Sequence, residues 1–289
     1  GLAHNGGMRL FKSADGVHWK QVGEKGVITV GAFDSANIAF WDKSIEKYRA
    51  YYRIFTEGTT TAEVWKPAGI RAIRTAVSDD LVHWGQFEDL TYGDSPPQQM
   101  YTNNVISYSR APHIMVGFPM RYVERGWSPS MRALPDLENR EIRAEAHIRY
   151  GTALTETQLM TSRDGIEFKR WDEAFIRPGV ERKDSWYYGH NNVAWQMATT
   201  ASRFEGADDE ISFYAEAGGW HGTGKTLTRY TLRQDGFVSV NATLKGGQLT
   251  TRPLTFEGSE LELNLSTSAI GYVKVECLTA AGEVIDSFG

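Results

Sequence analysis

The sequence has a single cysteine, Cys277, so it can form no internal disulfide. Its cysteine content therefore does not indicate a cellular compartment. It has no apolar run that approaches the roughly 20 residues needed to cross a bilayer, which predicts no membrane partner. The first ten residues lack the apolar segment of a signal peptide. The net charge of −5 comes with no long basic run, and this argues against a nucleic-acid partner.

Several kinds of site chemistry are also missing. The sequence has no Cys/His cluster at metal-ligand spacing and no GxSxG elbow. Residues 222–225 resemble part of a phosphate-binding loop, but the required spacing between its glycines is absent, so we read them as a hairpin. We therefore expect no metal site and no cofactor.

Aromatic residues are what the sequence has in good supply. They make up 12% of the chain, with 9 Trp and 13 Tyr, while the hydrophobic (41%) and charged (23%) fractions are ordinary for a globular protein. Trp and Tyr rings pack well in sheets and also stack on sugar rings. We expect sheet packing to account for most of them and ligand binding for the remainder.

A turn motif recurs along the chain. Three copies begin with Ser-x-Asp, and the fourth keeps the Asp-Gly pair. Each copy leads into a short outgoing segment, and in three of the four copies this segment ends with an aromatic residue. Asp-Gly is a strong hairpin signal because glycine takes positive φ at little cost. The copies are SADGVHW (13–19), SDDLVHW (78–84), SRDGIEF (162–168) and RQDGFVS (233–239). Because their aspartates recur with the turn, we interpret Asp15, Asp80, Asp164 and Asp235 as structural.

A second motif precedes the last three turns and aligns Asn37, Asn104 and Asn192. Together the motifs define units at 34–86, 101–172 and 188–240, each with four strands in up-and-down order, and no window of comparable length keeps a helical period. Radially repeated four-stranded units are typical of a β-propeller. A β-sandwich would also explain many strands, but not this recurrence.

The two ends of the sequence differ from the repeat. Residues 1–19 contain only the last two strands of a unit, so we expect an N-terminal truncation within a blade. Residues 241–289 show period-two alternation instead, which predicts a short, incomplete antiparallel β-sandwich-like module. The predicted domains are thus 1–240, a partial five-bladed propeller of about three and a half blades, and 241–289.

The same motifs resemble a known superfamily across nearly the whole chain. The quoted stretches are FDSANIAFWD, KYRAYYR, SDDLVHW, YTNNVISYSRAPHIMVGFPMRY, LMTSRDG, RWDEAFIRPG and TLRQDGFVSV. They resemble the glycoside hydrolase family 32/43-like five-bladed propellers, and in particular the bacterial proteins labelled glycosyl hydrolase family 32-like. The resemblance implies a cavity at the propeller axis that holds acidic catalytic residues, and a periplasmic or secreted location. The invertase-type Asn-Asp-Pro motif is absent, which leaves open whether at least one active-site acid lies outside this sequence.

Glycosidic cleavage uses two carboxyl groups, and we looked for acids that the repeat does not demand. Asp34 opens a first strand where the other units have Tyr101 and Gly189. This position makes Asp34 the best candidate for the base or nucleophile, against the alternative of a capping Asp. Glu156 and Glu216 are candidates for the acid, although either could be a solvated edge residue. Glu173 is better placed on a connection between blades.

We also expect a group of substrate-binding residues from the same repeat positions. Arg53 and Arg121 end second strands and could hold a carboxylated sugar in bidentate fashion, or pair with the acids. His190 replaces Ser35 and Thr102 of the other units, and a structural role is an equal alternative. The remaining candidates are Tyr101, Asn104 and Trp220, whereas Trp195 fits core packing better.

These expectations predict a glycoside hydrolase that cleaves plant or algal oligo- or polysaccharides with paired carboxylates in the central pocket. The expected partner is therefore a carbohydrate substrate, and the oligomeric state stays open. A non-catalytic carbohydrate-binding propeller is the alternative, and it would show an aromatic shelf with a single acid. A scaffold for protein partners would instead show apolar rim patches and no acid pair.

Overall fold

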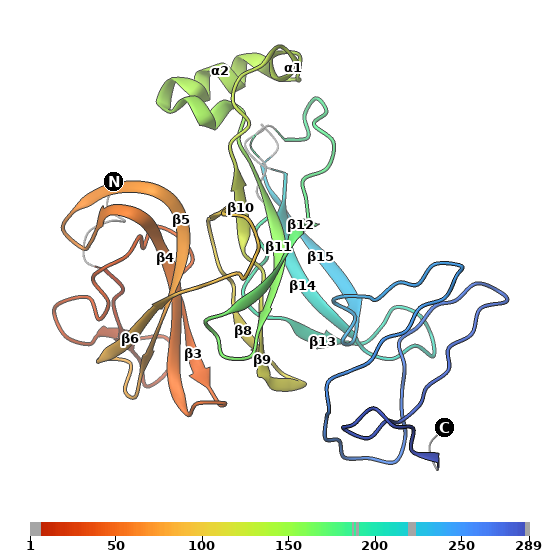
Figure 1. The fold of residues 1–289 in the computed structure, drawn as a ribbon. Helices are drawn as coiled ribbons and strands as arrows, with labels where there is room; N and C mark the ends of the chain where they lie inside the picture. Colours follow the sequence, from red (N-terminus) through yellow and green to blue (C-terminus); the bar gives the residue numbers. More distant parts are fainter. Residues whose placement is uncertain (1–6, 187, 189–190, 219–223, 287–289) are drawn as a thin grey trace. The chain divides into compact units, whose positions relative to one another are not determined.

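The structure is a computed structural model, and it describes residues 7–186, 188, 191–218 and 224–286. It confirms the predicted all-β, propeller-like class: almost all regular structure lies in antiparallel sheets (Figure 1). Contacts divide the chain into two compact units. The first comprises residues 1–200 and 211–231, and the second comprises 201–210 with the chain from 232 onward.

The predicted unit at 34–86 forms one complete blade. Its four strands are paired in the order β3-β4-β5-β6, each antiparallel to the next, as an up-and-down blade requires. Their bounds are β3 Ile38–Asp42, β4 Lys47–Thr60, β5 Trp65–Ser78 and β6 Trp84–Asp89. The long hairpin formed by β4 and β5 continues past the rest of the blade. It carries Phe55 and Trp65 beyond the short outer strands.

The unit at 101–172 also forms a blade, with an interrupted second strand. Strands β9 and β10 pair with the same edge of β11, on either side of Phe118 and Pro119, and β12 pairs with the other edge. The added strand β7 pairs with β10. The bounds are β7 Gln99–Met100, β8 Ile106–Tyr108, β9 Ala111–Gly117, β10 Met120–Val123, β11 Leu154–Ser162 and β12 Phe168–Ile176.

The unit at 188–240 has fewer strands than predicted. Among its described residues three strands form, β13 Ala198–Thr200, β14 Glu210–Ala217 and β15 Thr226–Arg233, together with a bridge between Val193 and Ala215. The expected fourth strand does not follow the turn at 235–236. In the other turns an aromatic closes the motif, and the indoles of Trp19 and Trp84 bond back to the turn carbonyls. Ser239 at the equivalent position offers no such anchor.

At the N-terminus, the predicted half-unit forms a two-stranded hairpin of β1 (Phe11–Lys12) and β2 (Lys20–Gln21). At the other end, the strands predicted within 241–289 do not form in the described residues up to 286. Only bridges between Thr243 and Gly246 and between Leu278 and Val284 are present there. The alternating apolar residues of this segment are exposed, so they lack the sheet partner that strand formation needs. The predicted domain boundary at residue 240 stays a prediction.

A helical insertion between β10 and β11 is the main departure from the predicted repeat. It contains α1 (Pro129–Arg132), α2 (Leu137–Ala146) and a 3₁₀ helix (Ile148–Gly151). Ser128 caps α1 through its side chain, and Pro129 stands at the first helical position. None of the described helices is long and apolar enough to cross a membrane.

The first blade is buried on both of its faces. Tyr51 and Tyr52 on β4 point to opposite faces, as alternation along a strand requires, and both are 0% exposed. Tyr52 packs in a cluster with Ile28 and Ile54, whereas Tyr51 packs with Met100, Met160 and other residues of the second blade. Sheets stacked face to face in this way are the packing of neighbouring propeller blades.

The recurring turns are held by their own side chains. In the first three copies the Ser hydroxyl accepts a hydrogen bond at 2.9 Å from the backbone N–H three residues later. One oxygen of the Asp accepts hydrogen bonds from the two backbone N–H groups that follow that one. The bonds that Asp80 accepts from His83 and Val82 lower its pKa well below the ordinary Asp value. These contacts support the structural reading of the turn aspartates.

One turn also joins two blades. Gly165 has φ +77°, and its carbonyl accepts a hydrogen bond from Tyr51 Oη of the first blade at 2.9 Å. A Cβ at this position would lie 2.7 Å from Tyr51 Oη and 2.8 Å from the Arg49 guanidinium. Gly16, at the same place in the first turn, has φ +74° and open space around it.

We predict that Gly165→Ala lowers the free energy of unfolding more than Gly16→Ala does. Both variants acquire the cost of a left-handed alanine, about 1–2 kcal/mol. Only Gly165→Ala also forces Tyr51 or Arg49 to move, which costs about 1–3 kcal/mol more. Urea denaturation of the two variants measures the difference. Equal losses would contradict this account of the contact between the blades.

Candidate functional site

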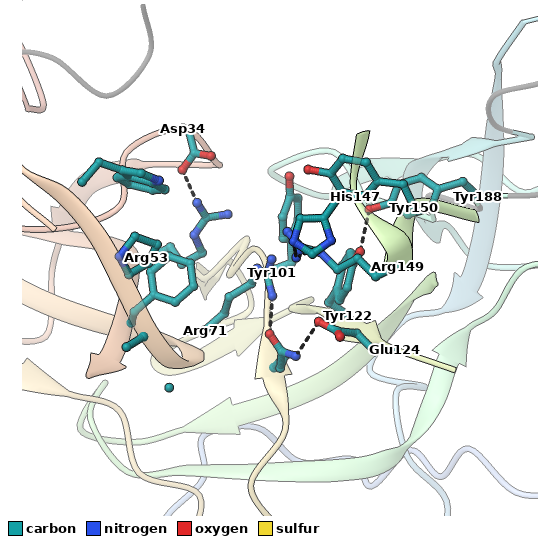
Figure 2. Close-up of a pocket in the computed structure, with 16 residues that line it drawn as sticks. Asp34, Arg53, Arg71, Tyr101, Tyr122, Glu124, His147, Arg149, Tyr150 and Tyr188 are labelled. Carbon is teal, nitrogen blue, oxygen red and sulfur yellow. Dashed lines mark hydrogen bonds and ion pairs between the residues drawn. The ribbon is translucent and has the colours of Figure 1, made fainter. Parts of the chain in front are cut away.

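A cavity of about 490 Å³ lies in the first compact unit, which comprises residues 1–200 and 211–231. It forms where the equivalent positions of neighbouring blades meet (Figure 2). Asp34 and Tyr101, which occupy the same place in their repeats, both line it, and so does Tyr188, one residue before the third copy of that position. Ser35 Oγ donates to the Tyr101 carbonyl at 2.6 Å and ties the first two of these segments together. The remaining lining residues come from β4, β5, β7, β10 and the helical insertion.

Asp34 is the predicted catalytic acid that lines the cavity. Its Oδ1 accepts a hydrogen bond from Arg53 Nη2, so the two side chains form an ion pair. The Arg53 side chain is 3% exposed and that of Asp34 is 27% exposed, so the carboxylate keeps access to the cavity while the guanidinium is packed behind it. Arg53 also lies over the rings of Phe55 and Tyr101.

A second carboxylate, Glu124, lines the same cavity. It follows β10 directly and accepts a hydrogen bond from Gln99 Nε2 at 3.3 Å. Gln99 in turn accepts from Arg71 Nη1, so an amide links the guanidinium to the carboxylate, as Figure 2 shows. Glu124 is not predicted from the sequence, because it lies in the insertion, outside both repeated motifs.

The helical insertion supplies three further residues that sequence reasoning misses: His147, Arg149 and Tyr150. Arg149 Nη1 contacts both ring nitrogens of His147, and its guanidinium lies 5.1 Å from the centre of the Tyr150 ring. The signal that could reveal this segment is local: a Ser-Pro helix start at 128–129 and a run of good helix formers at 137–146.

Four tyrosines make up much of the cavity wall: Tyr101, Tyr122, Tyr150 and Tyr188. Tyr188 Oη donates to Tyr122 Oη at 3.0 Å, and the rings contact one another at centroid distances of 5.9–6.2 Å. Burial raises the pKa of Tyr122 and Tyr188 above the ordinary tyrosine value, so both hydroxyls stay protonated and can donate hydrogen bonds. The wall thus combines flat apolar faces with hydroxyl groups.

Glu156 and Arg121 lie next to each other on paired strands, and neither is among the residues that line the cavity. They face one another in the β10–β11 register, Arg121 Nη2 donates to Glu156 Oε1, and Arg177 Nε is 3.8 Å from the other carboxylate oxygen. Glu156 is 7% exposed. The structure brings this acid and this arginine together with each other, but not with Asp34.

The other predicted site residues lie elsewhere. Glu216 pairs with Lys225 at 2.7 Å and does not line the cavity. Asn104 is buried, and its amide donates to Asn192 Oδ1 at 3.1 Å and to the Val193 carbonyl, which connects two units of the repeat. His190 and Trp220 lie outside the described residues. Their roles, like those of Glu156, Glu216, Arg121 and Asn104, stay predictions.

Within the described part of the chain, no group of three or more His, Cys, Asp or Glu side chains could hold a metal ion. The polar groups that line the cavity include carboxylates, guanidinium groups, tyrosine hydroxyls and the imidazole of His147.

No family model matches the sequence, and no curated protein matches it. Solved structures to which this chain is distantly similar include the following two. One is an N-acetylgalactosamine deacetylase from F. plautii in complex with blood group B trisaccharide, with 12% identity, a TM-score of 0.38, and coverage of 63% of this chain and 40% of that chain. The other is a Bombyx mori GH32 β-fructofuranosidase, with 12% identity, a TM-score of 0.40, and coverage of 72% and 35%.

This chain therefore spans less than half the length of either structure. The likeness to both structures is distant. The superfamily that the sequence motifs resemble stays a prediction.

The Asp34–Arg53 pair leads to a stability prediction. Asp34→Ala leaves the Arg53 guanidinium buried without its counter-ion, so we expect the free energy of unfolding to fall by about 2–4 kcal/mol. Glu216→Ala breaks a solvent-exposed pair and should change it by less than about 0.5 kcal/mol. Urea denaturation of both variants tests this ordering. A smaller loss for Asp34→Ala than for Glu216→Ala would show that Arg53 needs no counter-ion.

Proposed function

We propose that the protein binds carbohydrate in this cavity and hydrolyses its glycosidic bonds. The observation that carries the proposal is that two carboxylates, Asp34 and Glu124, line one cavity whose wall is built of tyrosines. Sugar rings stack on aromatic faces, and tyrosine hydroxyls can bond to sugar hydroxyls. A volume of about 490 Å³ lies within the usual range for small-molecule sites. The substrates we propose are the plant or algal oligo- and polysaccharides that the sequence resemblance implies.

The two carboxylates suit different steps. Asp34 is held in place by the buried Arg53 while its carboxylate keeps access to the cavity, and this geometry suits a base or nucleophile. Glu124 is exposed and, among the described residues, accepts a hydrogen bond from the Gln99 amide rather than pairing with a cation, so we assign it the role of the acid. In hydrolysis Glu124 would protonate the leaving oxygen, while Asp34 attacks the anomeric carbon or activates water.

Glu156 and Glu216 remain alternative acids from the sequence. Glu156 is held by Arg121 and lies near Arg177, and Glu216 is held by Lys225, so in this arrangement each is occupied by a cationic partner. Placing the acid at Glu124 instead puts both carboxylates on the wall of a single cavity. Mutation can distinguish these alternative acids, because each glutamate can be replaced by its isosteric amide.

The test is hydrolysis of a panel of oligosaccharides and aryl glycosides by the full chain and its variants. We expect Asp34→Asn and Glu124→Gln each to lower kcat about 10²- to 10⁴-fold, as loss of a catalytic acid or base does. Glu88→Gln, an exposed acid on β6, is the matched control and should retain activity. Circular dichroism verifies that each variant is folded.

Activity that survives in Glu124→Gln but is lost in Glu156→Gln or Glu216→Gln would move the acid to that residue. Activity unaffected by Asp34→Asn in a folded variant would overturn the proposal for Asp34.

A non-catalytic carbohydrate-binding site is the second candidate. The observation that favours it is that Asp34 and Glu124 each already accept a hydrogen bond from a neighbouring side chain, while arginines outnumber carboxylates in the cavity. Measurable sugar binding without turnover of any substrate in the panel would support this candidate over hydrolysis.

A further inference from the structure

Arg71 is a buried cation in the wall of the cavity. It lies on β5 opposite Phe55 of β4 and is 8% exposed. Burying a guanidinium is costly unless an anion or several acceptors compensate for the lost water. The partners of Arg71 therefore indicate whether the protein alone provides that compensation.

The described residues give Arg71 little compensation. Its one hydrogen bond there runs from Nη1 to Gln99 Oε1, and its buried Nε has no acceptor. It makes no ion pair within that part of the chain. The rings of Tyr122 and Phe55 lie 4.6 and 5.5 Å from its Cζ. Ring faces attract the cation, but they do not accept its in-plane N–H groups as a carboxylate does.

Two more arginines surround the same space, so the positive charge is concentrated. Arg53 and Arg149 line the cavity beside Arg71, and the buried Nε and Nη1 of Arg53 and the buried Nε of Arg149 also have no acceptor. Burial, followed by the charges of Arg53 and Arg149, lowers the pKa of Arg71. The cavity carboxylates do not offset this, since Asp34 is paired with Arg53 and Glu124 reaches Arg71 only through Gln99.

We propose that the Arg71 region is a subsite for the anionic group of the substrate, a carboxylate or a sulfate carried on a sugar. The sugar part rests on the proposed function, whereas the anion subsite rests on the arginines themselves. Arg71 and Arg149 bind the anionic oxygens, and Arg53 stays with Asp34. The cavity then separates two tasks: Asp34 and Glu124 face the glycosidic bond, and the arginines fix the charged substituent. Uronic-acid and sulfated sugars therefore bind in preference to neutral ones.

The experiment measures binding by calorimetry for uronic-acid oligosaccharides, sulfated oligosaccharides and neutral oligosaccharides of equal length. The proteins compared are the unmodified 289-residue chain, Arg71→Gln, Arg71→Lys and the control Arg74→Gln. Arg74 lies on the same strand but pairs with Asp89 at 2.5 Å, outside the cavity. We expect the charged sugars to bind more tightly than neutral ones and more weakly as salt is added. Arg71→Gln should weaken this binding about 10- to 100-fold and leave neutral-sugar binding unchanged.

A separate arm uses inorganic sulfate as the probe, with thermal unfolding as the readout. Sulfate should raise the Tm of the unmodified protein and of Arg74→Gln, but not that of Arg71→Gln. If sulfate protects the protein while no oligosaccharide binds, the anion subsite stands and the carbohydrate function fails. The ratio of uronic-acid to sulfated-sugar affinity identifies which anionic group the subsite takes.

Equal affinity for neutral and charged sugars in the unmodified protein overturns the subsite, whatever the variants do. Unchanged charged-sugar binding in a folded Arg71→Gln also overturns it. If Arg71→Gln does not fold, Arg71→Lys decides: it keeps the charge but loses the planar fork, so the subsite requires weaker binding in this variant too.

Discussion

The structure depends on the burial of the first blade between its neighbours. Tyr51 and Tyr52 are adjacent on β4, point to opposite faces and are both fully buried. An isolated four-stranded sheet would leave both of these faces in water, so the blade is stable only when other parts of the chain cover each side. The contact between Tyr51 and Gly165 shows how closely the second blade approaches.

This packing also determines where the site forms. Because successive blades repeat the same strand order, equivalent positions of the repeat converge on one region. Asp34 and Tyr101 occupy such positions and both line the cavity, while buried asparagines tie the segments together behind them. The repeat thus provides a scaffold, and the residues that differ between copies provide the chemistry.

The sequence predicts the blades well because their signals are local. A Ser-x-Asp turn followed by an aromatic fixes a hairpin through bonds within seven residues, and the strands on either side follow from it. The same local signal fails at residues 233–239, where Ser239 replaces the aromatic and no fourth strand forms. Period-two alternation of apolar residues does not predict strands correctly after residue 240. It indicates which face of a strand would be buried, but it does not provide a neighbouring strand for pairing.

The candidate site is predicted less completely, for a different reason. Asp34, Arg53 and Tyr101 can be found because comparison between copies of the repeat singles them out. Glu124, His147 and Arg149 belong to an insertion that has no counterpart in the other copies, so no comparison reveals them. Arg71 is missed although it lies on a repeated strand, because only its burial and its neighbours distinguish it from any other strand arginine.

Arg71 also explains why the insertion matters. Arg149 and Tyr150 border the same cavity, so the insertion reduces the water available to Arg71 while adding a second cation beside it. Both changes raise the cost of an empty site and increase the gain when an anion enters. In the proposed anion subsite, the insertion therefore contributes to the preference for one sign of charge.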